Sequence, residues 1–256
     1  MGTGAITQYI DLAQIALYVF WGFFAALIYY LHQENKREGY PLESERSGHV
    51  TVQGFPPIPS PKTYLLRDGR TVTVPNRLRE ERDLAAEPNG AYLGAPLEPT
   101  GDPMLAGVGP GSWAQRADIP DTTLDGDLRI VPLRVTKGYG VSRKDPNPIG
   151  MPVLGADGEL AGEVIDLWVD RAEAMFRYLE VEVPTSAGPR HVLLPINFSK
   201  IDRQCVRVRS ILGSQFAQVP GIRTQDRVTL LEEDMIVAYY GAGTLYATPQ
   251  RQEPLL

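Results

Sequence analysis

The side chains best suited to chemistry in this sequence form an acidic cluster in and near the segment DLWVDRAEAMFR. This segment carries Asp166, Asp170, Glu173 and Arg177, and a further acid, Glu233, lies in the later segment LLEED. Carboxylates that lie close together in a poorly hydrated site repel one another, so some of their pKa values rise and the group titrates as a unit. Such a spread of pKa values suits the relay of protons. Any one of these charges could instead belong to a solvated face or to a structural salt bridge.

The arginine of this cluster is predicted to lie on the apolar face of a strand. Arg177 alternates with Leu179, Val181 and Val183, and alternate residues of a strand point to the same side. A buried guanidinium needs a carboxylate partner. We therefore expect an acid of the cluster to pair with it.

Other kinds of site find little support in the sequence. The three histidines, His32, His49 and His191, are far apart and in no ligand spacing, so no zinc or haem site is expected on this chain alone. Cys205 is the only cysteine, which excludes an intrachain disulfide and fits a reducing compartment. No Walker sequence or nucleophile elbow is present, and the formal charge of −6 argues against nucleic-acid binding. An enzyme working by itself is not expected.

The N-terminal part of the chain contains one long apolar stretch, Leu12–Leu31. As a helix its 20 residues reach roughly 30 Å, the thickness of a bilayer's hydrocarbon core, so residues 12–32 are predicted to span a membrane. Lys36 and Arg37 follow it, which places the rest of the chain in the cytoplasm and residues 1–11 in the periplasm. A cleaved signal peptide is the alternative, but the basic n-region and a small-residue cleavage site are missing.

Two features of the spanning helix indicate contacts outside the chain. Gly22, Ala25 and Ala26 lie one turn apart, and small residues at this spacing let another transmembrane helix approach closely, although an ordinary lipid-facing helix is an equal alternative. Tyr30 and Arg37 are candidate contacts for an anionic lipid headgroup at the cytoplasmic interface.

Residues 33–115 are punctuated by proline, which breaks helices and central strands. The only regular element expected there is a hairpin in TYLLRDGRTVTV, with Asp68-Gly69 as its turn. Such a segment buries no core of its own, so it is either a disordered linker or an ordered strap on a partner. Its scattered aromatic and aliphatic side chains favour an extended surface strap.

Residues 116–245 show short alternating strands separated by turns. Ile165, Leu167 and Val169 are predicted to share one face of a strand that turns Asp166, Trp168 and Asp170 to the other. About six such strands predict a small closed or nearly closed β-barrel. A short helix is expected near residues 228–237, and residues 246–256 are expected to form an irregular tail.

Several long motifs resemble the H subunit of the photosynthetic reaction centre of purple bacteria. They are YYLHQENKREGYPLE, PTGDPMLAGVGPGSW, NPIGMPV, GEVIDLWVDRAEAMFRYLEVEV and VTLLEEDMI, and the similarity covers nearly the whole chain. The resemblance implies a single N-terminal transmembrane α-helix and a mainly-β cytoplasmic domain. That domain would be a small PRC-type β-barrel with an extended proline-rich strap and a short C-terminal helix.

The same resemblance implies a function for the acidic cluster. Members of this family are accessory subunits of a light-driven electron-transfer complex and have no autonomous active site. They cap the cytoplasmic face of the L and M subunits, stabilise the complex and take part in proton delivery to the secondary quinone. The family's acids matching Asp170, Glu173 and Glu233, with the arginine matching Arg177, lie near that quinone's pocket; Asp166 is a weaker member of the set.

The resemblance also implies the surroundings of the chain. Bacteriochlorophyll, bacteriopheophytin, quinones, non-haem iron and a carotenoid would be bound on L and M, and none of them by this chain alone. A cytochrome subunit, light-harvesting antenna polypeptides and membrane lipids are further candidate partners. The expected location is the bacterial inner, intracytoplasmic membrane.

One departure from the family concerns the proton entrance. Better-known members have surface histidines in the region matching LDGDLRI, where this chain has Asp125 and Asp127. A carboxylate has an ordinary pKa of about 4 against about 6.5 for histidine, so these two acids predict a weaker or alternative entrance. The rival to the whole interpretation is a membrane-tethered PRC-barrel adaptor that recruits a soluble partner.

Overall fold

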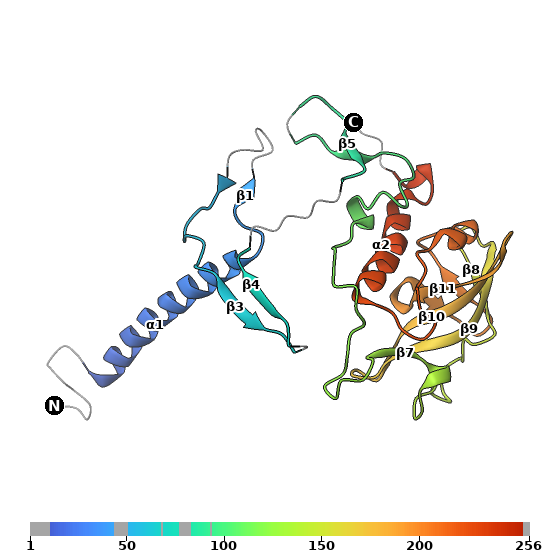
Figure 1. Ribbon diagram of the computed structural model, residues 1–256, viewed down its shortest axis with the longest axis horizontal. Helices are drawn as coiled ribbons and strands as arrows, with labels where there is room; N and C mark the ends of the chain where they lie inside the picture. Colours follow the sequence, from blue (N-terminus) through green and yellow to red (C-terminus); the bar gives the residue numbers. More distant parts are fainter. Residues whose placement is uncertain (1–10, 44–50, 68, 77–82, 93, 253–256) are drawn as a thin grey trace. The chain divides into compact units, whose positions relative to one another are not determined.

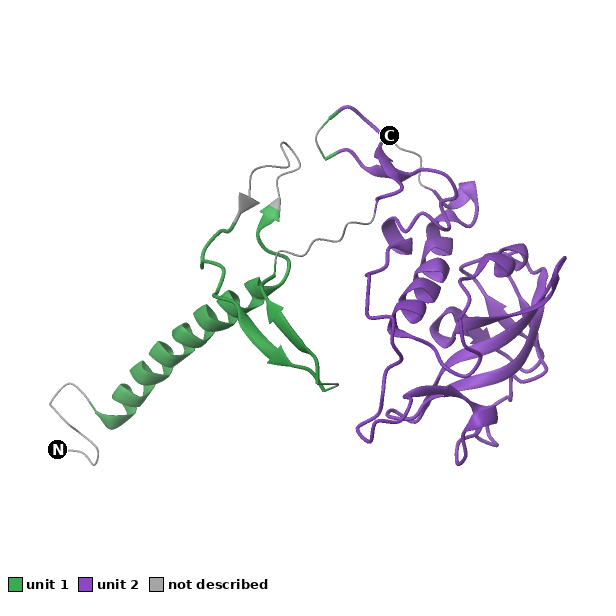
Figure 2. Cartoon of the chain, viewed as in Figure 1, with its two compact units in different colours: residues 1–81, 92–94 green, residues 82–91, 95–256 purple. Residues whose placement is uncertain are grey.

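The computed structural model describes residues 11–43, 51–67, 69–76, 83–92 and 94–252 (Figure 1). The chain divides into two compact units (Figure 2). Unit 1 comprises Met1–Glu81 and Tyr92–Gly94, and unit 2 comprises Arg82–Ala91 and Ala95–Leu256.

Unit 1 is built on the long helix α1, Leu12–Glu34, which is followed by a 3-10 turn, Asn35–Arg37. The carboxylate of Asp11 caps the first turn by accepting a hydrogen bond of 2.7 Å from the backbone N–H of Gln14. Over residues 12–37 the helix is long and apolar enough to cross a membrane, and none of the side chains of α1 is buried within the chain. It extends slightly beyond the predicted range 12–32.

The end of α1 is held by two buried basic residues. The guanidinium of Arg37 binds both carboxylate oxygens of Glu34 at 2.8 and 2.9 Å and the carbonyl oxygen of Ser60 at 2.6 Å. Lys36 donates to the carbonyl oxygens of Gln53 and Pro56, each at 2.6 Å. The donors of Arg37 are thus used inside the chain and its side chain is only 8% exposed, which does not favour the predicted contact with a lipid headgroup.

The proline-rich region contains more regular structure than the sequence predicted. The expected hairpin is present as β3, Lys62–Leu65, and β4, Thr71–Val74; Gly69 of its turn has φ +82°, and Asp68 lies outside the described residues. Two further antiparallel pairs occur, so the prediction of a single regular element is wrong. They are β1, Leu42–Glu43, with β2, Thr51–Val52, and β5, Ala86–Pro88, with β6, Leu97–Pro99.

The main sheet of unit 2 has seven strands in the order β11-β10-β9-β8-β13-β12, with β7 also paired to β9 (Figure 1). It curls into a half-barrel, in agreement with the predicted mainly-β fold. All pairings are antiparallel except that of β13 with β8. The strands are β7, Ile130–Pro132; β8, Pro152–Leu154; β9, Leu160–Asp170; β10, Met175–Thr185; β11, Gly188–Pro195; β12, Ser199–Ile201; and β13, Val206–Val208.

The central strand β9 is buried on both of its faces near its end. Leu167 is 1% exposed and its neighbour Trp168 is fully buried, so the face that carries the aspartates also packs against protein. An ionised carboxylate in such a position needs charged or hydrogen-bonding partners. The burial of β9 therefore dictates that Asp166 and Asp170 sit within polar networks.

Two bulges interrupt the ladder between β9 and β10. The register passes from Phe176 opposite Val169 to Tyr178 opposite Trp168, which leaves Arg177 as an extra residue on β10. The second shift leaves Ile165 as an extra residue on β9. Arg177 is therefore not on the buried apolar face that the alternation predicted; its side chain is 37% exposed and turns toward the end of β9.

The helix α2, Leu230–Tyr246, packs its buried residues into the core of the half-barrel. A reciprocal capping box between Thr229 and Glu232 begins it, and the fully buried ring of Tyr240 stacks on Phe198 with centroids 5.7 Å apart. The helix is longer than the predicted 228–237. Its added part includes two residues that favour helices poorly, Gly241 and Gly243.

Those two glycines are explained by close packing on α2. A Cβ on Gly241 would overlap the carbonyl oxygen of Pro110, in the 3-10 turn Gly109–Gly111, and a Cβ on Gly243 would overlap the carbonyl oxygen of Ser210. Tertiary packing thus outweighs helix propensity here. The predicted irregular tail also changes, because Tyr246 still belongs to α2 and Pro249–Arg251 forms another 3-10 turn.

Candidate functional site

Asp170 is the centre of a densely connected polar cluster in unit 2. It ends β9, and its side chain has no exposed surface. Its Oδ1 accepts hydrogen bonds from the backbone N–H groups of Ala172 at 2.9 Å and Glu173 at 3.1 Å. The carboxylate thereby fixes the turn to β10, in which Ala174 adopts a left-handed conformation with φ 52°.

Two arginines bracket this carboxylate. The Nε of Arg129 lies 3.1 and 3.0 Å from the two oxygens of Asp170, and the Nε of Arg177 lies 3.2 Å from Oδ2. Arg129 comes from the segment before β7, whose first residue, Ile130, is paired with Asp170 in the sheet. Arg177 comes from the bulge in β10.

Glu173 joins the two arginines through its two oxygens. Its Oε1 lies 2.6 Å from Arg129, and its Oε2 lies 2.9 Å from Arg177. Asp121 adds a third acid, with its Oδ2 3.0 Å from Arg129. The cluster, which we call the Asp170 network, comprises Asp121, Arg129, Asp170, Glu173 and Arg177.

The charges of the Asp170 network keep its central acid ionised. Burial by itself raises the pKa of Asp170, but hydrogen bonds from Arg129, the backbone of Glu173 and Arg177 outweigh it and lower the pKa. The same contact with Asp170 raises the pKa of Arg129 despite partial burial. Asp170 therefore fixes the arginines, while Glu173, at 46%, is the most exposed member of the network.

Glu233 has the opposite electrostatic environment. It lies in the first turn of α2, and its Oε2 accepts a hydrogen bond of 2.7 Å from the hydroxyl of Tyr178. Burial raises the pKa of Glu233, and the nearby charge of Asp121 acts in the same direction, against the hydrogen bond and against Arg177. Because Asp121 and Arg177 belong to the Asp170 network, Glu233 is electrostatically coupled to it.

A pH-dependent stability effect follows from the raised pKa of Glu233. A carboxyl whose folded pKa is raised stabilises the fold below its unfolded pKa of about 4.3, and this contribution is lost as the pH rises through the folded value. Glu233→Gln removes this pH-dependent loss of stability, because glutamine does not ionise. Its amide oxygen still accepts the hydrogen bond from Tyr178. The stability of the variant relative to the unmodified chain is expected to increase from about pH 4 to neutrality.

Urea unfolding of the full chain in detergent micelles at several pH values measures this difference. Glu159→Gln, at an exposed acid in the turn before β9, is the matched control and is expected to give a flat profile. A flat profile for Glu233→Gln as well would contradict the assignment.

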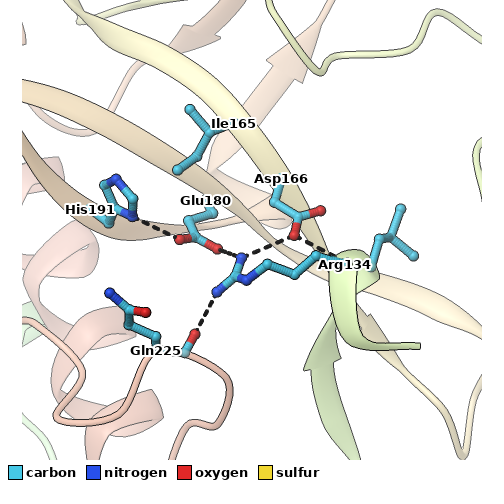
Figure 3. Close-up of a pocket in the computed structure, with 7 residues that line it drawn as sticks. Arg134, Ile165, Asp166, Glu180, His191 and Gln225 are labelled. Atoms are coloured by element: carbon cyan, nitrogen blue, oxygen red, sulfur yellow. Dashed lines mark hydrogen bonds and ion pairs between the residues drawn. The ribbon is translucent and has the colours of Figure 1, made fainter.

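Asp166 belongs to a second polar cluster, centred on Arg134 (Figure 3). One nitrogen of Arg134 lies 3.0 Å from Asp166 and 2.5 Å from Glu180, which is almost fully buried. Glu180 also accepts from the indole N–H of Trp168 at 2.9 Å and lies 3.1 Å from Nδ1 of His191. Arg134, Asp166, Glu180 and His191 line a depression of about 510 Å³.

The prediction that Asp166 joins the same cluster as Glu173 is therefore wrong. Asp166 and Asp170 are four residues apart on one strand, which is about 13 Å. Each meets a different arginine, Arg134 or Arg129, at opposite ends of β7. The other four predicted residues are brought together: Asp170, Glu173 and Arg177 in direct contact, with Glu233 beside them through shared charges.

The two acids predicted as a proton entrance lie on an exposed loop next to the Asp170 network. A bridge between Thr122 and Leu128 closes the loop, which carries Asp125 and Asp127 at its solvent side. Asp127 lies 4.0 Å from Arg171, and its side chain is 71% exposed. The entrance remains a prediction, and this loop leads directly into Arg129.

The predicted packing and lipid residues of α1 lie on its exposed surface. Gly22, Ala25 and Ala26 are exposed, and a Cβ on Gly22 would meet no atom of the described chain within 4 Å. Tyr30 is also exposed, and the ammonium of Lys62 lies 5.7 Å from the centroid of its ring. These surfaces are exposed in the chain, and their contacts with a neighbouring helix or with lipid remain predictions.

Sequence reasoning missed several residues of both clusters. Arg129 and Asp121 of the Asp170 network, Tyr178 beside Glu233, and the Arg134–Glu180 pair were not singled out. Glu180 could have been found from the sequence, since it is a charged residue in the apolar run YLEVEV of a strand with two buried faces. Arg129 could not, because 41 residues separate it from Asp170.

Two models of known protein families match this sequence. A model described as the photosynthetic reaction centre H-chain N-terminal region matches residues 4–135, just over half of the sequence. The chain belongs to this reaction-centre H-chain family. A second model, for the PRC-barrel domain, matches residues 141–215 and confirms the predicted fold.

As a reaction-centre H chain, the protein is a subunit of a photosynthetic complex that contains pigments and quinones, and it associates with the L and M subunits. Its family comprises structural subunits rather than enzymes, and together with the apolar α1 it indicates a membrane-anchored protein. Membership of this family argues against the alternative interpretation, a membrane-tethered adaptor unrelated to the reaction centre. Both polar clusters join the two matched regions, since Arg129 and Arg134 lie in the first and Asp170 and Asp166 in the second.

Proposed function

We propose that the domain of residues 116–245 caps the L and M subunits on their quinone-reducing face and supplies acidic residues for proton delivery to the secondary quinone. In this arrangement the N-terminus is periplasmic and the domain cytoplasmic, in the bacterial inner membrane. The proline-rich region 33–115 would lie as a strap over L and M. Pigments, quinones, non-haem iron and a carotenoid would be held by L and M.

One observation carries the proposal: a partly buried acid with a raised pKa lies beside a network of ionised groups. Glu233 is the carboxyl whose environment favours the protonated form, whereas Asp170 is held ionised. Neighbouring groups with pKa values pushed apart can hold and release protons in sequence.

The members of the site have different parts in this proposal. Glu173 exchanges protons with solvent or with the loop of Asp125 and Asp127, because its carboxylate is half exposed while it contacts both arginines. Asp170 fixes Arg129 and Arg177 and sets the local potential. Glu233 stores a proton behind Tyr178. Asp166, which lies in the Arg134 cluster, is left out of the relay.

Glu173→Gln tests the relay in the intact reaction-centre complex. The substitution keeps a hydrogen-bonding side chain but removes the titratable group, so the second, proton-coupled electron transfer to the quinone is expected to slow at least about tenfold. Flash-induced absorbance kinetics between about pH 6 and pH 9 measure this rate.

Glu182→Gln is the matched control for this experiment. Glu182 is 48% exposed, close to the value for Glu173, but it lies beside His191 and outside the Asp170 network. It is expected to leave the rate unchanged. Normal kinetics in Glu173→Gln, or equal slowing in both variants, would exclude the assignment.

A further inference from the structure

A second surface of the half-barrel has a charge opposite to that of the chain as a whole. A groove of about 470 Å³ lies between the β12–β13 hairpin and the end of α2. Its charged lining consists of Lys200, Arg207, Arg209 and Arg251, and no carboxylate lines it. The full sequence has a net charge of −6, so this groove concentrates positive charge on an acidic protein.

The sheet register forces these cations together. Lys200 on β12 is directly opposite Arg207 on β13, and like charges in this position destabilise a strand pair. Arg209 follows two residues later and is exposed like Arg207, whereas Val208 between them and Val206 before them are buried. An anion bound between these side chains would relieve the repulsion.

Few of these charges are neutralised within the chain. Asp202 lies 3.1 Å from Arg207, but neither Lys200 nor Arg209 forms an ion pair with any residue that the structure describes. Arg251 donates to the carbonyl oxygens of Ser210 at 2.6 Å and Arg209 at 2.9 Å. These bonds anchor its side chain at the groove without neutralising its charge.

We infer that this groove binds a phosphate-bearing anion, supplied either by a phospholipid headgroup or by a soluble phosphate compound. Guanidinium groups match phosphate oxygens through paired N–H donors, and a lysine adds a mobile point charge. The hydroxyls of Ser199 and Thr244, which also line the groove, supply further polar contacts. The site is separate from the Asp170 network and does not depend on the proposed proton relay.

Isothermal titration calorimetry of the intact complex in an uncharged detergent tests the inference. The two probes are inorganic pyrophosphate and a short-chain phosphatidylglycerol, added at low ionic strength because salt screens exposed charges. Arg209→Gln is expected to weaken binding about tenfold, as the loss of one charge-assisted contact predicts. Binding of pyrophosphate alone identifies a soluble phosphate, and binding of the lipid alone identifies a headgroup that needs its acyl part.

Arg203→Gln is the matched control, since it removes the same charge from the turn between β12 and β13 but does not line the groove. It is expected to change the affinity less than about twofold. Equal weakening by the two variants would show diffuse attraction to surface charge and overturn the inference. Failure of both probes to bind the unmodified complex would overturn it as well.

Discussion

Replacing Arg129 with methionine is expected to destabilise the half-barrel by about 3–5 kcal/mol. The substitution keeps much of the side-chain volume but takes from the buried Asp170 its closest cationic partner, with contacts of 2.9 to 3.1 Å. Breaking a buried ion pair costs more than a surface pair contributes, because the remaining charge stays poorly solvated. Urea unfolding of the full chain in detergent micelles, followed by tryptophan fluorescence, measures the loss.

The effect has a predictable pH dependence. Because the folded pKa of Asp170 is lowered, this acid contributes stability that is present above its unfolded pKa of about 3.9 and is lost as the pH falls through the folded value. Without Arg129 the pKa of Asp170 in the folded state is lowered less. The difference in stability between Arg129→Met and the unmodified chain is therefore expected to shrink in acid.

Arg207→Met provides the control for charge removal at an exposed pair. Arg207 lies 3.1 Å from Asp202, but its side chain is 59% exposed, so its loss is expected to cost about 1 kcal/mol or less. If Arg129→Met cost no more than this, Asp170 would not depend on Arg129 for its burial.

Gly162→Ala is expected to have the other large effect, a loss of about 4 kcal/mol or more. A Cβ at this position would overlap the backbone carbonyl of Glu182 on the neighbouring strand and crowd the side chain of Val181. Because the obstacle is backbone, it cannot move aside without separating β9 from β10. These are the two strands that carry Asp170 and Glu180, so both polar clusters would be disturbed.

Gly140→Ala is the control for this substitution. A Cβ there meets no atom within 4 Å, and the residue has no positive φ, so the change is expected to be neutral or to stabilise by up to about 1 kcal/mol. Thermal unfolding of the two full-length variants compares them directly. A neutral Gly162→Ala would mean that β9 and β10 do not approach as closely as the structure shows.

Local pattern was enough to predict the elements of the fold that local forces determine. The β3–β4 hairpin and the strands of the half-barrel follow from alternation and turn residues. The extension of α2 through Gly241 and Gly243 did not follow, because those residues reflect contacts with Pro110 and Ser210, far away in the sequence.

In the candidate site, too, some features could be predicted from the sequence, whereas others depend on contacts between distant segments. The family resemblance identified Asp170, Glu173, Arg177 and Glu233, which the structure brings near one another. Alternation placed Arg177 on the wrong face, because a single extra residue in β10 changes the direction of its side chain. Arg129 was not predicted, since only the pairing of β7 with β9 brings it to Asp170.

The helix α1 has no buried side chain within its own chain. Its sequence therefore has two separate tasks, anchoring in the membrane and recognition of a neighbouring helix. In a bilayer, apolar side chains gain nothing by leaving lipid for one another, so the hydrophobic residues determine only the depth of insertion. Recognition of a neighbouring helix depends on shape, and Gly22, Ala25 and Ala26 are the residues predicted to provide it. One apolar residue could thus replace another over much of α1 without loss of anchoring, whereas the predicted packing role of Gly22 leaves no room there for even one added methyl group.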